Sequence, residues 1–246
     1  MRLKDKTAIV TGGASGFGAG IVRKFVAEGA RVAIADLNGA AAQALANELG
    51  AIAIEADVSS DASVSALVTK ALGAFGRIDI LVNNAGIGHL PQPLEGLSEA
   101  EFDRIFAVNG KSVYLTARHV VPLMKAAGGG AILNVASTGG VSPRPRLTWY
   151  NASKGWMITA TRAMAVELAH AQIRVNAINP VAGETPLLRT FMGEDTPEMR
   201  AKFLSTIPLG RFSKPEDIGN TACFLCSDEA SMITGVALEV DGGRCI

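Results

Sequence analysis

Residues 7–18 read Thr-Ala-Ile-Val-Thr-Gly-Gly-Ala-Ser-Gly-Phe-Gly, an apolar run followed at once by a glycine-rich turn. The run Thr7–Val10 is expected to form a buried strand. Gly12, Gly16 and Gly18 allow a tight turn and a close approach of the backbone, so that amides at the start of the next helix can face a pyrophosphate. The stretch therefore predicts a dinucleotide-binding strand, turn and helix, although an ordinary strand-to-helix turn has the same local pattern.

Short apolar runs alternate with longer amphipathic segments along the rest of the chain, as a parallel sheet with crossover helices requires. We therefore expect a single-domain, Rossmann-like α/β fold over residues 1–246, in which a doubly wound, parallel, seven-stranded sheet carries helices on both faces. The expected strands are Thr7–Val10, Arg31–Ala35, Ala51–Glu55, Ile78–Val82, Ala131–Val135, Arg174–Ile178 and Ala237–Val240. The expected helices are Gly16–Glu28, Ala40–Leu49, Ser63–Phe75, Ser98–Ala127, Trp149–Ala169 and Lys214–Ser227.

One long segment, from Pro180 to about Pro208, interrupts this alternation after the sixth expected strand. Ligands of parallel α/β sheets bind outside the carboxyl ends of the strands, where this segment begins. Long loops in compact domains are also often functional. We therefore expect a substrate lid at about residues 181–208.

Composition limits the classes of function. Of the 246 residues, 48% are hydrophobic, which suits one domain with a large core. The 23 Lys and Arg balance the 23 Asp and Glu, so no net field attracts nucleic acid or an anionic membrane. No apolar run approaches the roughly 18 residues of a membrane span, and Met1–Lys6 lead into the first strand without a signal-peptide core. We expect a cytoplasmic protein that acts on a small molecule and binds neither nucleic acid nor membrane.

Cys223 and Cys226 have the spacing of a redox or metal pair, and Cys245 brings the cysteines to an odd number. The pair lies in an apolar helical segment with no second ligand pair nearby, and the three histidines are scattered. We interpret the two cysteines as core residues and expect neither a disulfide framework nor a metal site.

Asp36 follows Gly18 by 18 residues and ends the second expected strand. A carboxylate at this point can accept hydrogen bonds from both ribose hydroxyls of an adenosine, and it repels a 2′-phosphate. No Arg or Lys compensates at positions 15, 37 and 38, which are Ser, Leu and Asn. The sequence therefore predicts that NAD is preferred over NADP; a solvated turn aspartate is the alternative reading.

Tyr150 and Lys154 stand four residues apart at the start of a helical segment, so their side chains share one face. A phenol with a pKa near ~10 is a weak base at neutral pH, but a neighbouring ammonium favours its ionised form. The pair therefore predicts a general base. Ser137 ends the fifth expected strand, where its hydroxyl can hold a substrate oxygen against Tyr150 during hydride transfer.

These motifs, in this order, resemble those of the short-chain dehydrogenase/reductases over essentially the whole chain. Asp57-Val58 resembles the adenine-contacting pair of that family, and Asn83-Asn84-Ala85-Gly86 resembles its fourth-strand motif. The resemblance implies that the cofactor lies against Gly12, Ser15, Gly16, Phe17, Gly18, Asp36, Leu37, Asp57, Val58, Asn84, Ala85, Gly86, Tyr150, Lys154, Pro180, Gly183 and Thr185.

The resemblance also implies the catalytic set Asn109, Ser137, Tyr150 and Lys154, in which Lys154 holds the nicotinamide ribose and Asn109 supports a water-linked proton path. From the residues alone, Asn109 is equally well an amide bonded to backbone inside a helix. A homotetramer is implied as well, with segments 98–127 and 149–169 pairing between subunits. Long apolar helix faces serve the core of a monomer equally well.

One departure from the family pattern lies after the sixth strand. Where the family usually has Asn-Pro-Gly, this chain has Val181 after Pro180, and the glycine comes two residues later as Gly183. We expect Gly183 to restore backbone freedom there and the contacts to the nicotinamide carboxamide to be altered.

The candidate substrate residues are His89, Arg144, Trp149 and Glu184. Arg144 and Arg146 stand in the segment that leads to Tyr150, where a guanidinium can hold a carboxylate, a sulfonate or a phosphate-bearing carrier. Solvated loop or subunit-contact charges are the alternative. Leu187, Leu188, Phe191 and Met192 are expected to close the lid with Glu184.

The leading hypothesis is an oxidoreductase that transfers a hydride between NAD(H) and a secondary alcohol or ketone, with Tyr150 as general acid and base. A 3-oxoacyl-carrier or CoA thioester reductase using NAD(P)H is the first alternative. A non-catalytic, NAD-binding redox sensor is the second, and Ser137, Tyr150 and Lys154 argue against it. An epimerase with catalytic NAD needs a larger substrate domain than this chain offers.

Overall fold

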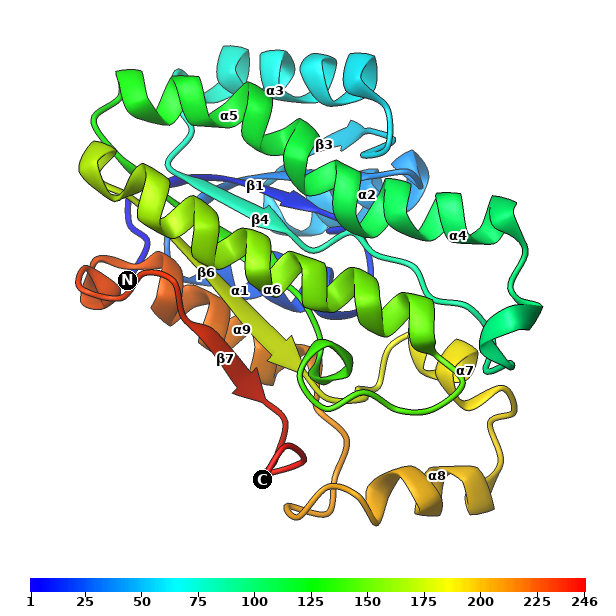
Figure 1. The fold of residues 1–246 in the computed structure, drawn as a ribbon. Coiled ribbons are helices and arrows are strands. Elements are labelled where there is room, and N and C mark those ends of the chain that lie inside the picture. Colours follow the sequence, from blue (N-terminus) through cyan, green and yellow to red (C-terminus); the bar gives the residue numbers. More distant parts are fainter.

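Seven parallel strands form one sheet in the computed structural model, which describes residues 1–246 (Figure 1). Their order across the sheet is β3-β2-β1-β4-β5-β6-β7, and each neighbouring pair is parallel. The strands are β1 (Thr7–Thr11), β2 (Arg31–Asp36), β3 (Ile52–Glu55), β4 (Ile80–Asn83), β5 (Gly130–Val135), β6 (Ile173–Pro180) and β7 (Ala237–Val240). Every expected strand is present, with its ends shifted by at most two residues.

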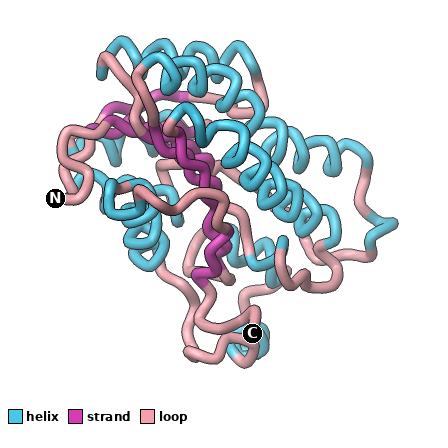
Figure 2. The backbone as a smooth tube through the Cα atoms, turned by 60° about the vertical axis from the view of Figure 1, so that its left-hand side comes forward, coloured by secondary structure: helices cyan, strands magenta, loops and turns pink.

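Helices cover both faces of the sheet, as Figures 1 and 2 show. Apolar residues of α1, α2 and α9 pack against one face, and those of α3, α5 and α6 against the other. The helices are α1 (Gly16–Ala27), α2 (Gly39–Leu49), α3 (Asp61–Phe75), α4 (Glu99–Phe106), α5 (Ser112–Ala126), α6 (Thr148–Leu168), α7 (Leu187–Met192), α8 (Pro197–Leu204) and α9 (Pro215–Cys226). Short 3₁₀ turns are η1 (Leu94–Gly96), η3 (Thr138–Gly140), η4 (Ala169–Ala171) and η5 (Asp228–Ala230). The predicted doubly wound α/β fold is confirmed.

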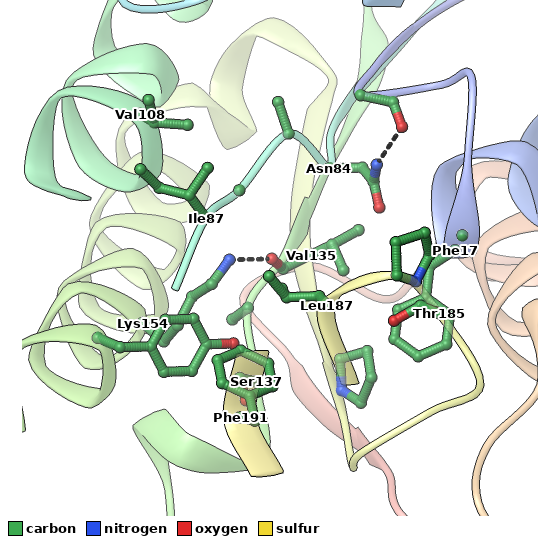
Figure 3. Close-up of a pocket in the computed structure, with 18 of the residues that line it drawn as sticks. Phe17, Asn84, Ile87, Val108, Val135, Ser137, Lys154, Thr185, Leu187 and Phe191 are labelled. Atoms are coloured by element: carbon green, nitrogen blue, oxygen red, sulfur yellow. Dashed lines mark hydrogen bonds between the residues drawn. The ribbon is translucent and has the colours of Figure 1, made fainter. Parts of the chain in front are cut away.

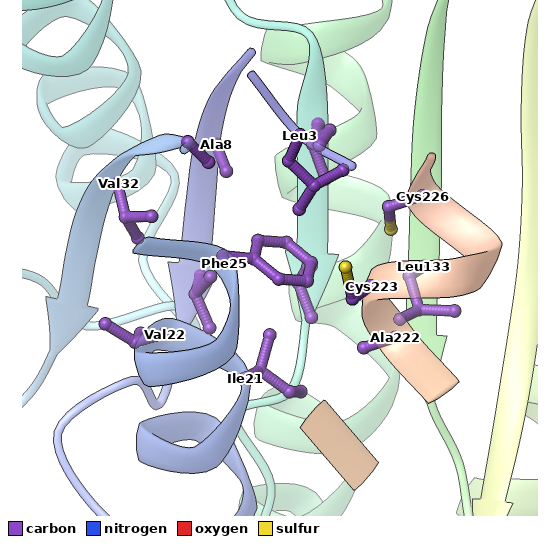
Figure 4. Close-up of a cluster of buried hydrophobic side chains, with 14 of the residues drawn as sticks. Leu3, Ala8, Ile21, Val22, Phe25, Val32, Leu133, Ala222, Cys223 and Cys226 are labelled. Carbon is purple, nitrogen blue, oxygen red and sulfur yellow. The ribbon is translucent and has the colours of Figure 1, made fainter. Parts of the chain in front are cut away.

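The larger core cluster lies between the sheet and the α1–α9 layer (Figure 4). Phe25 of α1 is fully buried there beside Leu3 and Ile21. Cys223 and Cys226 of α9 belong to the same cluster and are buried free thiols, so their interpretation as core residues is confirmed. Free cysteine packs as a small apolar side chain.

The chain winds outward in opposite directions from the neighbouring strands β1 and β4. β2 and β3 follow on one side, and β5, β6 and β7 follow on the other. At such a switch point the connecting segments diverge, which opens a crevice outside the carboxyl ends of the strands. No helix of the chain combines the length and the apolar character that a membrane crossing needs.

The segment predicted as one helix, Ser98–Ala127, is less regular than expected. A π-helical turn, η2 (Ala107–Lys111), joins α4 to α5. Asn109 lies in this wider turn, where its side chain bonds the backbone of Ile87 instead of solvent. Single π turns inside α-helices are frequent at functional sites, and hydrophobic periodicity alone does not reveal them.

The predicted lid segment, 181–208, contains two helices and is not a plain loop. Gly193, with φ of +77°, ends α7, and the Thr196 side chain caps α8. The segment has its own small apolar cluster, formed by Val181, Leu188, Met192, Phe203, Ile207 and Phe212. This packing gives the segment a defined shape over the carboxyl end of β6 (Figure 1).

Candidate active site

A cavity of about 690 Å³ runs along the carboxyl ends of the strands, from Leu37 after β2 to Phe203 of α8. It collects nearly all of the residues predicted to contact cofactor or to act in catalysis. Those that line it are Gly12, Ser15, Gly16, Phe17, Asp36, Leu37, Asp57, Val58, Asn84, Ala85, Gly86, Ser137, Tyr150, Lys154, Pro180, Gly183 and Thr185. Gly18 and Asn109 do not line the cavity. Each contacts a residue that does: Gly18 packs against Gly12, and Asn109 accepts a hydrogen bond from the Ile87 amide.

The glycine-rich turn is fixed by close backbone contacts. Gly12 has φ of +59° and Gly16 has φ of +52°, a conformation that side chains with a Cβ rarely adopt. A Cβ on Gly18 would lie 2.0 Å from the carbonyl oxygen of Gly12, so only glycine lets α1 pack against the turn. The Asn84 side-chain amide donates to the carbonyls of Thr11 and Gly12, each at 2.9 Å (Figure 3).

Helix α1 begins at this turn with free hydrogen-bonding capacity. Its N-cap residue, Ser15, makes no side-chain cap hydrogen bond. The first amides of an α-helix have no partner inside the helix and carry the positive end of its dipole. Because Ser15, Gly16 and Phe17 line the cavity, these amides face an opening that suits a pyrophosphate.

Asp36 ends β2 with its carboxylate held in place by the backbone. One oxygen accepts from the Ala14 amide at 3.0 Å, and the other accepts from the Asn38 amide at 2.9 Å. Leu37, 72% exposed, continues this wall of the cavity. Asp57 lies beside it, and its hydrogen bonds from the Ser59 hydroxyl and amide hold the pKa of its carboxyl below the usual range.

These features fit a nicotinamide dinucleotide. The uncapped start of α1 suits the pyrophosphate, the fixed Asp36 carboxylate suits a ribose diol, and Leu37 and Val58 offer apolar surface to an adenine. The Thr185 side chain lies beside Gly16, where a Cβ would come within 3.2 Å of it. The lid segment therefore meets the glycine-rich turn at the middle of the cavity.

Ser137 and Lys154 lie in the other half of the cavity (Figure 3). Tyr150 lines the cavity beside them. Burial raises the pKa of the Tyr150 phenol to about 12, and a hydrogen bond with the Ser137 hydroxyl acts in the opposite direction. The Lys154 ammonium donates to the Val135 carbonyl at 2.8 Å, and burial lowers its pKa to about 8. Burial therefore outweighs any lowering of the phenol pKa by Lys154, and the expected net lowering is not found.

Asn109 is fully buried and braces this site from behind. Its side chain accepts from the Ile87 amide at 2.9 Å and donates to the Ile87 carbonyl and to the Ser153 hydroxyl. Ser153 precedes Lys154 on α6 and donates to the Tyr150 carbonyl at 2.7 Å. Asn109 thus ties the segment after β4 to the helix that carries the catalytic pair.

The departure at Val181 has a simple structural outcome. Val181 has no positive φ, and its side chain is buried in the apolar cluster of the lid. Gly183 has no positive φ either, so the expected recovery of backbone freedom is wrong. A Cβ on Gly183 would lie 2.3 Å from the Phe17 ring, so glycine is needed there for space.

The candidate substrate residues separate in the structure. Arg144 lines the cavity, whereas His89, Trp149 and Glu184 do not. The His89 ring lies 2.8 Å from the Leu90 carbonyl oxygen, and the Trp149 indole donates to the Leu94 carbonyl. Glu184 is exposed. Lid residues Leu187, Leu188 and Phe191 line the cavity, and Met192 is buried behind them.

Several wall residues carry no signal in the sequence. Arg104, Val108 and Phe203 come from helices whose apolar pattern gives no reason to single them out. Asn151 is a partial exception, because it adjoins Tyr150; its side chain donates to the Arg144 carbonyl at 2.8 Å and holds the loop before α6. Only the tertiary arrangement of their helices brings Arg104, Val108 and Phe203 to the cavity.

Comparisons with known proteins show several similar oxidoreductases. A family model described as enoyl-(acyl carrier protein) reductase matches residues 12–244. The chain is 50% identical to 4-formylbenzenesulfonate dehydrogenase of Comamonas testosteroni over the full length of both chains. It is 38% identical to cis-4-hydroxycyclohexanecarboxylate dehydrogenase of Sinomonas cyclohexanicum, over 97% of this chain and 96% of that one. A 3-ketoacyl-(acyl-carrier-protein) reductase of Brucella melitensis, solved with NADH, has 54% identity and a TM-score of 0.95, covering 99% of this chain and 100% of that chain.

Proposed function

The chain belongs to the short-chain dehydrogenase/reductase family, and we propose that it interconverts a secondary alcohol and a ketone with NAD(H). One observation carries this proposal: Tyr150 and Ser137 line the same cavity as the dinucleotide-binding turn. The relatives named above as dehydrogenases support chemistry at an alcohol or carbonyl carbon.

The side chains divide the work as follows. Ser137 donates to the substrate oxygen and holds it beside the Tyr150 hydroxyl. With its pKa near 12, the Tyr150 phenol is protonated at neutral pH and donates this proton to a carbonyl oxygen during reduction. In the oxidising direction the same oxygen, deprotonated, takes the proton of the alcohol. A bound nicotinamide ring supplies the hydride acceptor or donor.

Lys154 and Asn109 support this pair. Lys154 projects between β5 and Gly86, where its Nζ atom would lie 3.3 Å from a Cβ on that glycine. From there it can hold the nicotinamide ribose, and its positive charge favours the phenolate. Asn109 positions α6 through its hydrogen bond to Ser153. It also supports the proposed water-linked proton path that leads from Lys154 to solvent.

We further propose that NAD is preferred over NADP. Asp36 has a fixed carboxylate where a 2′-phosphate would approach, and the neighbouring Leu37 and Asn38 offer no positive charge. His89, Trp149 and Glu184 remain proposed substrate residues only if a bound substrate or a second subunit rearranges the cavity mouth, since none of them lines it in this structure.

We also propose that the protein forms a homotetramer and is located in the cytoplasm. Tyr114 of α5 and Trp156 and Val166 of α6 are exposed, and large apolar side chains on two adjacent helices favour contact with another copy. The three cysteines are free, which suits a reducing compartment. Light scattering on a sizing column would measure the oligomeric mass.

A second candidate is a 3-oxoacyl thioester reductase. The likeness to the Brucella melitensis reductase and the description of the matching family model favour it. Both candidates use the same catalytic groups and differ in the substrate.

The deciding experiment is a spectrophotometric assay of the purified protein with NAD and NADP separately, against secondary alcohols, hydroxy acids, hydroxysulfonates and 3-hydroxyacyl thioesters. Two relatives are named for ring compounds that carry a sulfonate or a carboxylate, so such acids are tried first. NAD-dependent turnover supports the leading proposal, and turnover confined to thioesters supports the second. Cofactor binding without turnover of any compound contradicts both and favours an NAD-binding sensor.

A further inference from the structure

Arg144 stands at the end of the cavity that lies beyond Tyr150. Its guanidinium packs over the Phe203 ring, with 4.5 Å between the central carbon and the ring centroid. One of its five N–H donors is used, in a 2.7 Å hydrogen bond from Nη2 to the Thr206 hydroxyl. The side chain is half-buried between the loop before α6 and helix α8, so it has donors to spare inside a cavity wall.

No acidic group neutralises Arg144. None of the ten ion pairs of the chain includes it. Burial lowers the pKa of its guanidinium, the positive charge of Arg244 lowers it further, and the Cys245 thiol acts in the opposite direction. The Asp241 carboxylate makes no ion pair with Arg144 and instead accepts hydrogen bonds from the backbone amides of Gly243 and Cys245.

A second guanidinium, that of Arg244, lies near Arg144 but does not line the cavity. Its Nη1 and Nη2 atoms donate to the hydroxyl and the carbonyl of Ser142, two residues before Arg144. Its Nε atom is buried without a partner. Half-buried positive charge without a counterion is unfavourable, and a bound oxyanion would offset this cost.

Apolar side chains lie beside both the proposed catalytic phenol and Arg144. Leu147, Leu188, Phe191 and Phe203 line the cavity, and the Phe191 ring lies 4.7 Å from the Tyr150 ring. A ligand that reaches from the Tyr150 hydroxyl to the guanidinium therefore needs an apolar body with a polar group at each end.

We propose that the substrate carries a carboxylate or sulfonate on the side of an apolar body, such as a ring, opposite its reacting carbon, and that Arg144 binds this anion. The inference rests on the proposed function and makes Arg144 a specificity-determining residue. A guanidinium suits both groups, because its planar fork donates two parallel hydrogen bonds to two oxygens.

Arg146 provides the matched control. It stands two residues further along the same loop, is exposed, and does not line the cavity. Its one side-chain contact is a 3.5 Å hydrogen bond to the Pro91 carbonyl. Both arginines had the same interpretation from their place in the sequence, and the structure separates them.

The test compares Arg144→Met with Arg146→Met. Methionine keeps apolar contact with Phe203 and removes the charge.

The substrates are 4-(1-hydroxyethyl)benzoate, 4-(1-hydroxyethyl)benzenesulfonate and the neutral 4-(1-hydroxyethyl)benzamide, each with NAD. We expect Arg144→Met to raise KM for the two acids about 10- to 100-fold with little change in kcat, because one charge-assisted interaction is lost. KM for the amide, and all constants of Arg146→Met, should stay near wild type. Equal losses on acid and amide would overturn the inference.

Two further measurements distinguish a failure of the proposed function from a failure of the proposed anion site. Calorimetric binding of 4-acetylbenzoate and 4-acetylbenzamide to the protein with oxidised NAD needs no turnover, because neither the ketone nor the cofactor can donate a hydride. If no alcohol is oxidised, the proposed function fails, yet weaker binding of the benzoate alone by Arg144→Met still supports the anion site. Reduction of acetoacetyl-CoA and of the phosphate-free acetoacetyl N-acetylcysteamine tests a carrier phosphate as the anion. If Arg144→Met penalises only the CoA thioester and spares the small acids, the carboxylate or sulfonate assignment is wrong.

Discussion

The Phe191 ring of α7 packs on the Tyr150 ring of α6, with the centroids 4.7 Å apart and the planes inclined by 50°. Tyr150 is only 6% exposed, and this burial is what raises the pKa of its phenol to about 12. The predicted lid segment therefore covers the proposed acid–base group. Since burial penalises the phenolate, the cover favours the protonated form that reduction uses.

The pH dependence should differ between the two directions. Oxidation needs the Tyr150 phenolate, whose fraction grows about tenfold per pH unit below its pKa, so kcat/KM for the alcohol should rise steadily from neutral pH. Above about pH 8 the rise should flatten, because Lys154 then loses the charge that favours the phenolate. Reduction uses the phenol and should stay level through neutral pH. Rate profiles in both directions check this, and oxidation that is level between about pH 6 and 8 would contradict it.

Removing the cover should shift that profile. Phe191→Ala exposes the Tyr150 ring to water, so the pKa of the phenol should fall toward ~10 and the rise of oxidation should move to lower pH. The chain has two tyrosines, so Tyr114→Phe leaves Tyr150 as the only one. Near-ultraviolet titration of tyrosinate in Tyr114→Phe, with and without Phe191→Ala, measures the pKa directly. Identical titration curves would remove the lid from this role.

Tyr150→Phe should keep cofactor binding and lose turnover. The substitution removes the hydroxyl that exchanges the proton, and general acid–base catalysis contributes about 10²- to 10⁴-fold. Tyr114→Phe is the control, because Tyr114 is exposed on α5 far from the cavity lining. Turnover and NADH fluorescence titrations measure the two properties separately. Substantial turnover by Tyr150→Phe would exclude Tyr150 as the acid and base.

Asp36→Ala should weaken NAD binding by about 10- to 100-fold, since it removes charge-assisted hydrogen bonds to a ribose, and should raise the relative use of NADP. Asp36→Asn keeps an acceptor for the Ala14 amide while removing the charge that repels a 2′-phosphate. The two variants therefore separate support of the turn from charge repulsion. The ratio of kcat/KM for NAD and NADP is the readout, and an unchanged ratio in both would refute the assignment.

Two glycine substitutions should have opposite effects on stability. Gly18→Ala brings a Cβ within 2.0 Å of the Gly12 carbonyl oxygen, so it should lower the free energy of unfolding by about 1–3 kcal/mol or more and weaken NAD binding. Gly73 lies in α3 with nothing within 4 Å of a Cβ, and Gly73→Ala should add about 0.5–1 kcal/mol. Urea unfolding of both variants measures the change. A neutral Gly18→Ala would show that the turn can move away.

Part of the fold and of the candidate site can be predicted from the sequence. The strands, most helices and the cofactor wall follow from short-range patterns, such as the run Thr7–Val10 with its glycines and the four-residue spacing of Tyr150 and Lys154. The π turn at Asn109 does not, because it depends on hydrogen bonds to Ile87 after β4. Trp149 and His89 were predicted to contact substrate, yet the Trp149 indole N–H and the His89 Nδ1 atom face backbone carbonyls outside the cavity lining.

Local periodicity predicted the fold class, the resemblance of the ordered motifs predicted the family, and residue chemistry led to the proposed catalytic pair. These patterns act over a few residues, and a backbone with few conformations expresses them directly. Tertiary structure decided what each polar group faces: Lys154 the Val135 carbonyl, Tyr150 the Phe191 ring, and Arg144 the Phe203 ring instead of solvent. Desolvation and pairing set the charge and reactivity of such groups, and both depend on segments more than 18 residues away in the chain.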